Sequence, residues 1–497
     1  MRISGLASGM DVDSMVQQLM KANRVPLDKL NQKKQTLEWK RDSYRTINSQ
    51  LVDFRNNKLT AYRKSEALNV FKAEVSGDDK AISVKATTNA NRVPMEVKVE
   101  SLATQFTYGG ETPVAANANA KMTLDQLQPG GPDKYTLSVS RGPNDPNKVD
   151  FEFSKNESIG SVIRKINSEL KANVTASFDE ATGKFSIASN EYGSKALQLD
   201  GSDFLNAMKI DPTKPSGGDK AKATINGNPM EFNSNKNTIN GVEITFLAPS
   251  KQGEVSKITT KTDSDKIFET ITSFIKDYNS VLDALNKKVD EQRYRDYTPL
   301  TDEQKKAMKE DEVKLWNEKA QSGLLKNDEI LRSAIASLRQ PVVTASVTGS
   351  TMKLSGIGIT TGEWFEGGKL SISDPDKLRK AIEEHPDEVI ELFTGTGVSS
   401  PSQPKGFFND LYDGLDKPLK MLADRAGTNR YSADISVKFN EQSIMGKELT
   451  SLKDNIKVMT KKLTEMEKKY YTQFNAMETA MNKLNSQSAS LANFGMK

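Results

Sequence analysis

The sequence predicts an α+β protein of several domains, in which the two ends of the chain form helical coiled-coil or bundle legs and nested β-rich domains are inserted between them. Apolar residues recur at helical spacing near both ends, and they alternate with polar residues at a period of two between about residues 71 and 262. The 497 residues are enough for roughly three or four domains.

The first helix is predicted to begin at Asp11, because its carboxylate is a favourable N-cap and Asp13 then lies in the first turn. Apolar residues follow at helical spacing at Val12, Met15, Val16 and Leu19. The Val25-Pro26 pair predicts a break, since the residue before a proline disfavours helix and Pro26 suits the first turn of a second helix. That second helix has an apolar row every seven residues, at Leu30, Leu37, Tyr44 and Leu51.

The middle of the chain is predicted to be rich in β-strands. In the segment VPMEVKVES one face carries the apolar residues Val93, Met95, Val97 and Val99. Similar alternation occurs in YTLSVS, VDFEF, KFSIAS and GVEITFLAP, and one short helix is predicted from the spacing of Ile159, Val162, Ile163, Ile166 and Leu170. Linkers rich in glycine and proline bracket an inner block, so one β-rich domain interrupts another.

Helical periodicity resumes at Ile267. The segments MKLSGIGIT and GKLSIS predict a β-hairpin, and two shorter helices are expected on either side of GTGVSSPSQPKG. The last element is a long helix that begins before Leu449 and runs almost to the end of the chain. Its apolar row advances in steps of three and four residues, except for two steps of four at Met466–Tyr470–Phe474, which is the spacing of a coiled-coil stutter.

These boundaries predict four domains, each but the last assembled from two separate stretches. They are a terminal leg domain (1–45 with 455–497), a helical bundle with a β-hairpin (46–70 with 263–454), a β-rich inserted domain (71–115 with 216–262) and a second β-rich domain nested in the first (116–215).

Composition excludes several classes of function. The net charge is only +4 and both signs are interspersed, which argues against binding to nucleic acid or to an anionic membrane. No stretch approaches the ~18 apolar residues of a membrane span, and no signal peptide is expected, since Arg2 precedes glycines and aspartates. With no cysteine, disulfides, thiolate catalysis and Cys-ligated metal centres are all excluded.

No motif indicates an enzyme, a cofactor site or a metal site. The single histidine, His385, lies among carboxylates and is interpreted as a surface residue. The glycines of SGIGITTG miss the dinucleotide-binding spacing and are interpreted as turn residues of the hairpin. We therefore predict no catalytic residue and no cofactor.

Both ends of the chain avoid charge. Residues 1–20 and 470–497 carry six charged residues among 48, where the 27% average of the chain predicts about thirteen. Their polar faces are built from Asn, Gln and Ser, whereas a solvated helix face normally carries charge. An apolar row usually means a helix in the core of its own chain, but at the extreme ends we favour self-association through paired terminal helices.

The predicted assembly and leg interface consists of sixteen apolar residues. They are Val12, Val16, Leu19, Leu27, Leu30, Leu37, Tyr44, Leu51, Leu463, Met466, Tyr470, Phe474, Met477, Met481, Leu484 and Leu491.

Several segments resemble one protein family. The opening from Ile3 to Leu51 closely resembles the N-terminus of bacterial flagellar filament-capping proteins, the hook-associated protein 2 family. The segment YTPLTDEQKKAMKEDEVKLWNEKAQSGLLKND resembles the central signature of that family, and YYTQFNAMETAMNKLNSQSASL resembles its C-terminal helix. The segments LSGIGITT and GKLSISDPDKLRKAIEEHPDEVIELF also fit. SVIRKINSELKANVTASFDEATGKFSIAS is similar to an insertion motif of flagellins and other hook-associated proteins.

The resemblance implies a structural cap at the distal end of the flagellar filament that retains exported flagellin and promotes its folding and polymerisation. It implies secretion through the flagellar type III apparatus with an export chaperone, and a ring-like homo-oligomer, a pentamer. Flagellin, the filament end and the hook-associated junction proteins would be its other partners, and neither nucleic acid nor membrane insertion is expected.

Three alternatives remain open from the residues alone. The chain could be a hook–filament junction protein, or an adhesin that acts through the β-rich insert of roughly residues 71–262. It could also be a non-flagellar coiled-coil scaffold, in which case the match to the central signature would be a coincidence.

Overall fold

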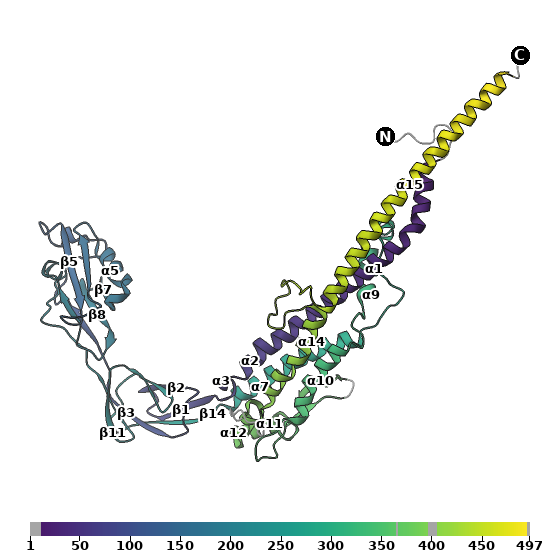
Figure 1. The fold of residues 1–497 in the computed structure, drawn as a ribbon. Coiled ribbons are helices and arrows are strands. Elements are labelled where there is room, and N and C mark those ends of the chain that lie inside the picture. The colour runs from purple at the N-terminus through teal and green to yellow at the C-terminus, as the bar shows by residue number, and fades with distance from the viewer. Residues whose placement is uncertain (1–10, 364–365, 396–404, 495–497) are drawn as a thin grey trace. The chain divides into compact units, whose positions relative to one another are not determined.

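The structure is a computed structural model that describes residues 11–363, 366–395 and 405–494 (Figure 1). The chain forms two compact units. One is built from the chain before residue 69 and after residue 263, and the other from residues 69–263. Each unit is described by itself.

The first unit is helical, and its longest elements are the two terminal helices α1 (Val12–Val52) and α15 (Ile444–Phe494). A π-helix (Asp53–Leu59) continues α1. The remaining elements are α2 (Thr60–Tyr62), α3 (Ser65–Leu68), α7 (Ser264–Asp290), α8 (Asp302–Ala307), α9 (Glu310–Gln321), α10 (Glu329–Thr344), a 3₁₀ turn (Leu354–Ile357), β15 (Ile359–Thr361), β16 (Leu370–Ile372), α11 (Pro375–Glu384), α12 (Pro386–Thr394), α13 (Phe407–Gly414) and α14 (Asp416–Ala426).

Helix α1 begins as the sequence predicts, with the Asp11 carboxylate accepting a hydrogen bond of 3.0 Å from the amide of Ser14. The predicted break at Pro26 is wrong, because α1 is continuous from Val12 to Val52 with Pro26 inside it. Pro26 and Ala22 are both exposed, so the carbonyl that loses its helical hydrogen bond lies on the solvent side, where water can satisfy it.

Helix α15 packs antiparallel against α1, and the two lie side by side in Figure 1. The Tyr471 hydroxyl donates to the Asp13 carboxylate at 2.9 Å, and Lys33 pairs with Glu448 at 3.6 Å. Residues 13–33 of α1 therefore lie beside residues 448–471 of α15. The prediction of one long C-terminal helix that begins before Leu449 is confirmed.

The second half of α1 enters a bundle with a true core. Tyr44 and Leu51 are 1% exposed, and Phe274, Phe407 and Phe408 of the same unit are completely buried. The Phe274 and Phe408 rings lie 4.8 Å apart between centroids, within a cluster of aromatic rings from α2, α7, α12 and α13. This cluster is the packed centre of the helical unit.

Residues 427–443 connect α14 to α15 without helix or strand and run along α1; we call this segment the strap. Side chains of α1 bind its backbone. Arg41 donates to the carbonyl of Asn440 and to that of Ala426 at the end of α14, just before the strap. Asn48 and Ser49 donate to the carbonyls of Asn429 and Ala433. The strap is thus held by one polar stripe of α1 rather than by a core of its own.

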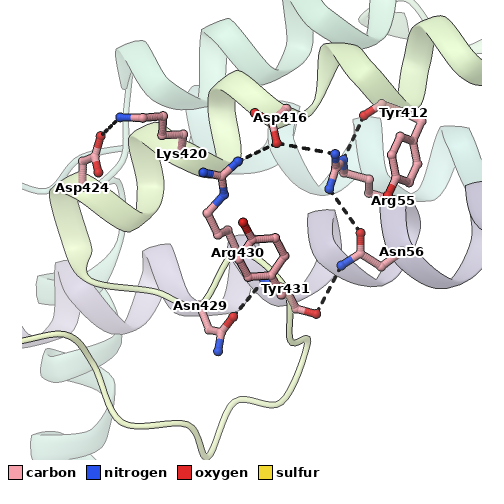
Figure 2. Close-up of polar contacts among 9 residues, drawn as sticks. All are labelled: Arg55, Asn56, Tyr412, Asp416, Lys420, Asp424, Asn429, Arg430 and Tyr431. Carbon is pink, nitrogen blue, oxygen red and sulfur yellow. Dashed lines mark hydrogen bonds and ion pairs between the residues drawn. The ribbon is translucent and has the colours of Figure 1, made fainter.

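Figure 2 shows how the π-helix joins the strap to α14. The Arg55 guanidinium donates to the Tyr412 carbonyl at 2.9 Å and stacks on its ring at 4.0 Å. Asp416 accepts from Arg430 at 2.6 Å and pairs with Arg55 at 3.5 Å, while Asn56 donates to the Tyr431 carbonyl. One carboxylate therefore bridges two arginines from segments far apart in sequence.

The second unit, residues 69–263, is built from antiparallel sheets. Five of its strands form one sheet in the order β1-β14-β3-β10-β11, and three form a second in the order β12-β13-β2. Their bounds are β1 (Phe71–Gly77), β2 (Ile82–Ala86), β3 (Met95–Ser101), β10 (Ala221–Ile225), β11 (Asn228–Phe232), β12 (Lys236–Ile239), β13 (Val242–Phe246) and β14 (Ser256–Thr262). Both sheets contribute to one core that includes Val97, Ile244 and Ile258.

A second core in this unit is formed by residues between Phe106 and Ile210. Its two sheets have the orders β4-β8-β7 and β6-β5-β9. The elements are β4 (Gln105–Gly109), α4 (Leu124–Leu127), β5 (Lys134–Ser140), β6 (Val149–Ser154), α5 (Ile159–Ser168), a 3₁₀ turn (Leu170–Ala172), β7 (Val174–Asp179), β8 (Lys184–Tyr192), β9 (Gln198–Asp200) and α6 (Ser202–Ala207).

Three local predictions need correction. Val93 precedes β3 and is 51% exposed, so only Met95, Val97 and Val99 share the buried face. Leu170 lies in a 3₁₀ turn after α5 and is 88% exposed, because the helix ends at Ser168. The β15–β16 hairpin is present, but its first strand is only three residues long because Leu354–Ile357 form a 3₁₀ turn.

Candidate functional site

The paired ends of α1 and α15 bury one apolar cluster. Val12, Val16, Met20 and Leu463 are at most 6% exposed and form its centre. Partly buried apolar residues surround them, namely Met15, Leu27, Met459, Met466, Tyr470, Tyr471 and Phe474. Seven of the sixteen predicted interface residues therefore meet in this cluster within a single chain.

The other predicted residues of α1 lie in three different environments. Tyr44 and Leu51 are buried in the bundle core, so their side chains are covered without a second copy of the chain. Leu30 and Leu37 are half-buried between the pair and the bundle. Leu19 is 43% exposed and lies outside the cluster.

Sequence reasoning missed Met20, which takes the place expected for Leu19. The residues Val12, Val16 and Met20 follow one another in steps of four, and this row faces α15. The apolar character of Leu19 concealed that row, although the four-residue spacing was visible in the sequence.

Polar contacts also link α1 to the segment that contains α8. Lys21 pairs with Glu303 at 2.8 Å, and Gln32 donates to the Pro299 carbonyl at 2.7 Å. The hydrogen bond and the charge of Glu303 raise the pKa of Lys21 above its ordinary value. Further along α1, the Tyr44 hydroxyl donates to the Asp328 carboxylate at 2.5 Å, and burial together with this bond raises the pKa of Tyr44.

Asp328 also accepts hydrogen bonds from the amides of Ile330 and Leu331, so it is the N-cap of α10. The segment between α7 and α10, which contains the central signature found in the sequence, is therefore tied to α1 at both of its ends.

Beyond Phe474, α15 continues to Phe494, and most of the described side chains there are exposed. Met477 is 42% exposed, Leu484 is 60% exposed and Met481 is half-buried. Between Asn475 and Phe494 the only charged residues are Glu478 and Lys483. The side chain of Leu491, also predicted at the interface, is outside the described residues. We call residues 475–494 the distal segment.

No group of three or more His, Asp or Glu side chains among the described residues is placed to hold a metal ion. Of the helices in the described part of the chain, none is both long enough and apolar enough to cross a membrane.

The fold defines a helical protein whose two terminal helices pair in antiparallel fashion, and one of them exposes apolar side chains beyond the pair. The particular family is shown by sequence comparison. Residues 8–105 match the model of the flagellar hook-associated protein 2 N-terminus, and residues 218–486 match the model of its C-terminus. The chain belongs to the flagellar hook-associated protein 2 family, the flagellar filament cap proteins.

Similar proteins come from several bacteria. The flagellar hook-associated protein 2 of Halalkalibacterium halodurans is 28% identical over 99% of both chains. That of Escherichia coli is 23% identical, over 88% of this chain and 92% of the relative. A crystal structure of the flagellar cap protein of Escherichia coli shares the fold, with a TM-score of 0.52 and 20% identity over 83% of this chain and 99% of that chain.

Family membership confirms the prediction of a flagellar filament cap and of a structural protein without enzymatic activity. The predicted fold class is also confirmed, since long terminal helices pack together and antiparallel β-sheet domains are inserted between them. The finer division into four domains stays a prediction.

Proposed function

We propose that this chain caps the distal end of the flagellar filament as a ring-like homo-oligomer of five copies, with the distal segment of each copy as a leg that packs against filament subunits. The cap retains exported flagellin and promotes its folding and polymerisation at the tip. The observation that supports the leg is the exposure of Met477 and Leu484 on a helix stretch with only two charged residues.

The physical reason is that an exposed apolar row gains free energy only when another surface covers it. Burying a leucine or methionine side chain contributes about 1.5–3 kcal/mol. Because the distal segment is already helical, its docking avoids most of the cost of ordering the backbone. The Asn, Gln and Ser side chains around the row can hydrogen-bond to a partner without the desolvation cost of buried charge.

We also propose export through the flagellar type III apparatus with an export chaperone, and neighbours that include flagellin and the hook-associated junction proteins. The absence of cysteine fits such a route, since the chain needs no oxidative folding in either compartment.

The leg is tested by replacing its apolar row in the native gene with the double variant Met477→Ser and Leu484→Ser. Flagellin is then expected in the culture medium, with short or absent filaments in electron micrographs. The matched control is Thr479→Ser with Asn485→Ser, which alters two exposed polar positions of the same segment. Normal filaments in the apolar double variant would contradict the leg.

The number of copies is tested by light scattering on the purified full-length chain. We expect a mass five times the 54.9 kDa of one chain. A stable mass of four or six chains would support a ring-like oligomer with that number of copies instead of five. A monomer at all concentrations would contradict self-assembly.

A further inference from the structure

The apolar row of α15 continues past the point where α1 begins. Tyr470 and Phe474 pack against the cluster that contains Val12. Beyond them the row advances in steps of three and four residues through Met477, Met481 and Leu484, which we call the distal row. These steps keep side chains on one side of a helix. The distal row therefore lies on the side of α15 that faces α1 where the two helices pair.

Helix α1 begins too late in the chain to cover the distal row. Its first residue is Val12, and the next, Asp13, accepts a hydrogen bond of 2.9 Å from the Tyr471 hydroxyl. Met477 and Leu484 lie about 9 and 20 Å further along the axis of α15 than Tyr471, at the standard helical rise. Within the described part of the chain they are accordingly 42% and 60% exposed.

The chain itself supplies a segment at this place. Residues 1–10, which we call the N-terminal segment, lie outside the described residues and directly precede the N-cap Asp11. Because α1 and α15 are antiparallel, the chain before Asp11 joins the pair at the end from which the distal row continues. Fully extended, ten residues span at most about 35 Å, which is more than the distance from Tyr471 to Leu484.

The composition of the N-terminal segment matches that of the distal row. It reads MRISGLASGM, and its only charged side chain is that of Arg2. Its larger apolar residues are Met1, Ile3, Leu6 and Met10. The segment can therefore place apolar side chains on Met477 and Leu484 and leave its single charge at the edge, in water.

We propose that the N-terminal segment lies along the distal row and covers it in the free chain. A segment tethered this close is present at an effective concentration on the order of millimolar, which a second copy in dilute solution does not reach. The contact belongs to the free chain and does not depend on the proposed leg. For the leg it means that a filament subunit has to displace the N-terminal segment before it meets Met477 and Leu484.

Disulfide formation tests this contact in the purified full-length chain, without flagellin. Because the chain has no cysteine, each engineered pair reports a single contact. Leu6→Cys is combined, in three separate variants, with Met477→Cys, Met481→Cys or Leu484→Cys. After mild oxidation of dilute protein, non-reducing gels give the rate of disulfide formation. A link within one chain changes its migration, whereas a link between two copies doubles its mass.

The matched controls place the second cysteine at the same level of α15 but on its opposite side. Leu6→Cys is combined with Asn475→Cys, Thr479→Cys or Asn482→Cys, which are all exposed positions. A tether without a preferred contact would reach both sides at similar rates. We expect the fastest distal-row variant to form its disulfide at least about tenfold faster than any control, at a rate independent of protein concentration.

A second measurement does not need a disulfide. Met481→Cys carries a fluorescent label that is sensitive to its environment, and Ile3→Ser with Leu6→Ser removes the apolar side chains that would cover it. We expect these two substitutions to shift the emission of the label toward its value in water, because the cover is lost. The control Ser4→Ala with Ser8→Ala keeps those apolar side chains and should leave the emission unchanged.

Equal disulfide rates in the distal-row and control variants would overturn the cover, and so would an unchanged emission after Ile3→Ser with Leu6→Ser. Disulfides mainly between two copies, at a rate that rises with protein concentration, would mean that a second chain covers the row and would also overturn it. None of these results affects the proposed cap function, because no flagellin is present. Conversely, normal filaments from the variant Met477→Ser with Leu484→Ser would contradict the leg and leave the cover unaffected.

Discussion

Helix α1 passes through two environments that differ in how completely they cover it. In the bundle, residues such as Tyr44 and Leu51 are enclosed on every side and are 1% exposed. In the pair with α15, only one side is covered, and only Val12, Val16 and Met20 of α1 are buried there. One continuous helix thus passes from an enclosed core into a pair that covers it on one side only.

The difference lies in what surrounds the helix, because both halves have apolar residues at helical spacing. The bundle half is packed by α7, α14 and the strap, whereas the other half has α15 and the short α8–α9 segment. We therefore expect the bundle to supply most of the stability of the helical unit. The pair, which is covered on one side only, should contribute less.

The largest effect is expected at the bundle core. Leu51→Ala removes most of a fully buried side chain, so the free energy of unfolding should fall by about 3–5 kcal/mol. Urea unfolding followed by circular dichroism measures it, with the exposed Leu484→Ala as control. A loss of at most about 0.5 kcal/mol, the range of ordinary surface changes, would remove the contrast between the two halves.

A smaller loss of stability is expected in the pair, and it should differ between the neighbouring residues Met20 and Leu19. Met20→Ala should lower the local stability of α1 by about 2–3 kcal/mol, the low end for a core methionine because only one side is covered. Leu19→Ala should change it by at most about 0.5 kcal/mol. Hydrogen exchange of the amides in residues 12–24 measures both, and equal losses would contradict the observed phase of the helix.

Tyr44 gives a pH-dependent test of the bundle. Tyr44→Phe removes the hydrogen bond to Asp328 and should cost about 1.5 kcal/mol at neutral pH. Because the folded pKa is raised, the unfolded chain loses the Tyr44 proton first, at about pH 10, and stability falls as the pH rises further.

The slope contributed by this tyrosine is about 1.4 kcal/mol per pH unit, and Tyr44→Phe should remove it. Urea unfolding between pH 9 and 11 compares the two proteins. An unchanged slope in the variant would show that Tyr44 titrates normally in the folded chain.

The smallest effect is expected for the exposed ion pair between Lys21 and Glu303, whose side chains are 70% and 71% exposed. Lys21→Gln should leave the unfolding midpoint unchanged within experimental error, because solvent screens such pairs. A clear loss in urea unfolding would mean that α8 stabilises the pair more than burial indicates.

Much of this architecture could be predicted from local patterns. The N-cap at Asp11, the long C-terminal helix and the strands around Val97 and Ile244 each depend on spacing within a few residues, and the structure has all of them. The charge-poor ends were equally visible, since composition requires no knowledge of contacts. These features could be predicted because each depends on residues that lie close together in the sequence.

Tertiary packing decided the rest. Pro26 continues a helix because α15 packs beside α1 and the Ala22 carbonyl, which Pro26 leaves without a helical donor, lies on the solvent side. A local rule for proline includes neither fact. Tyr44 belongs to a core and Met477 to a surface although both continue apolar rows, since burial depends on which distant helices arrive beside them. The sequence alone established the helices, their apolar rows and the family, and only the fold separated the side chains that hold the chain together from those left exposed.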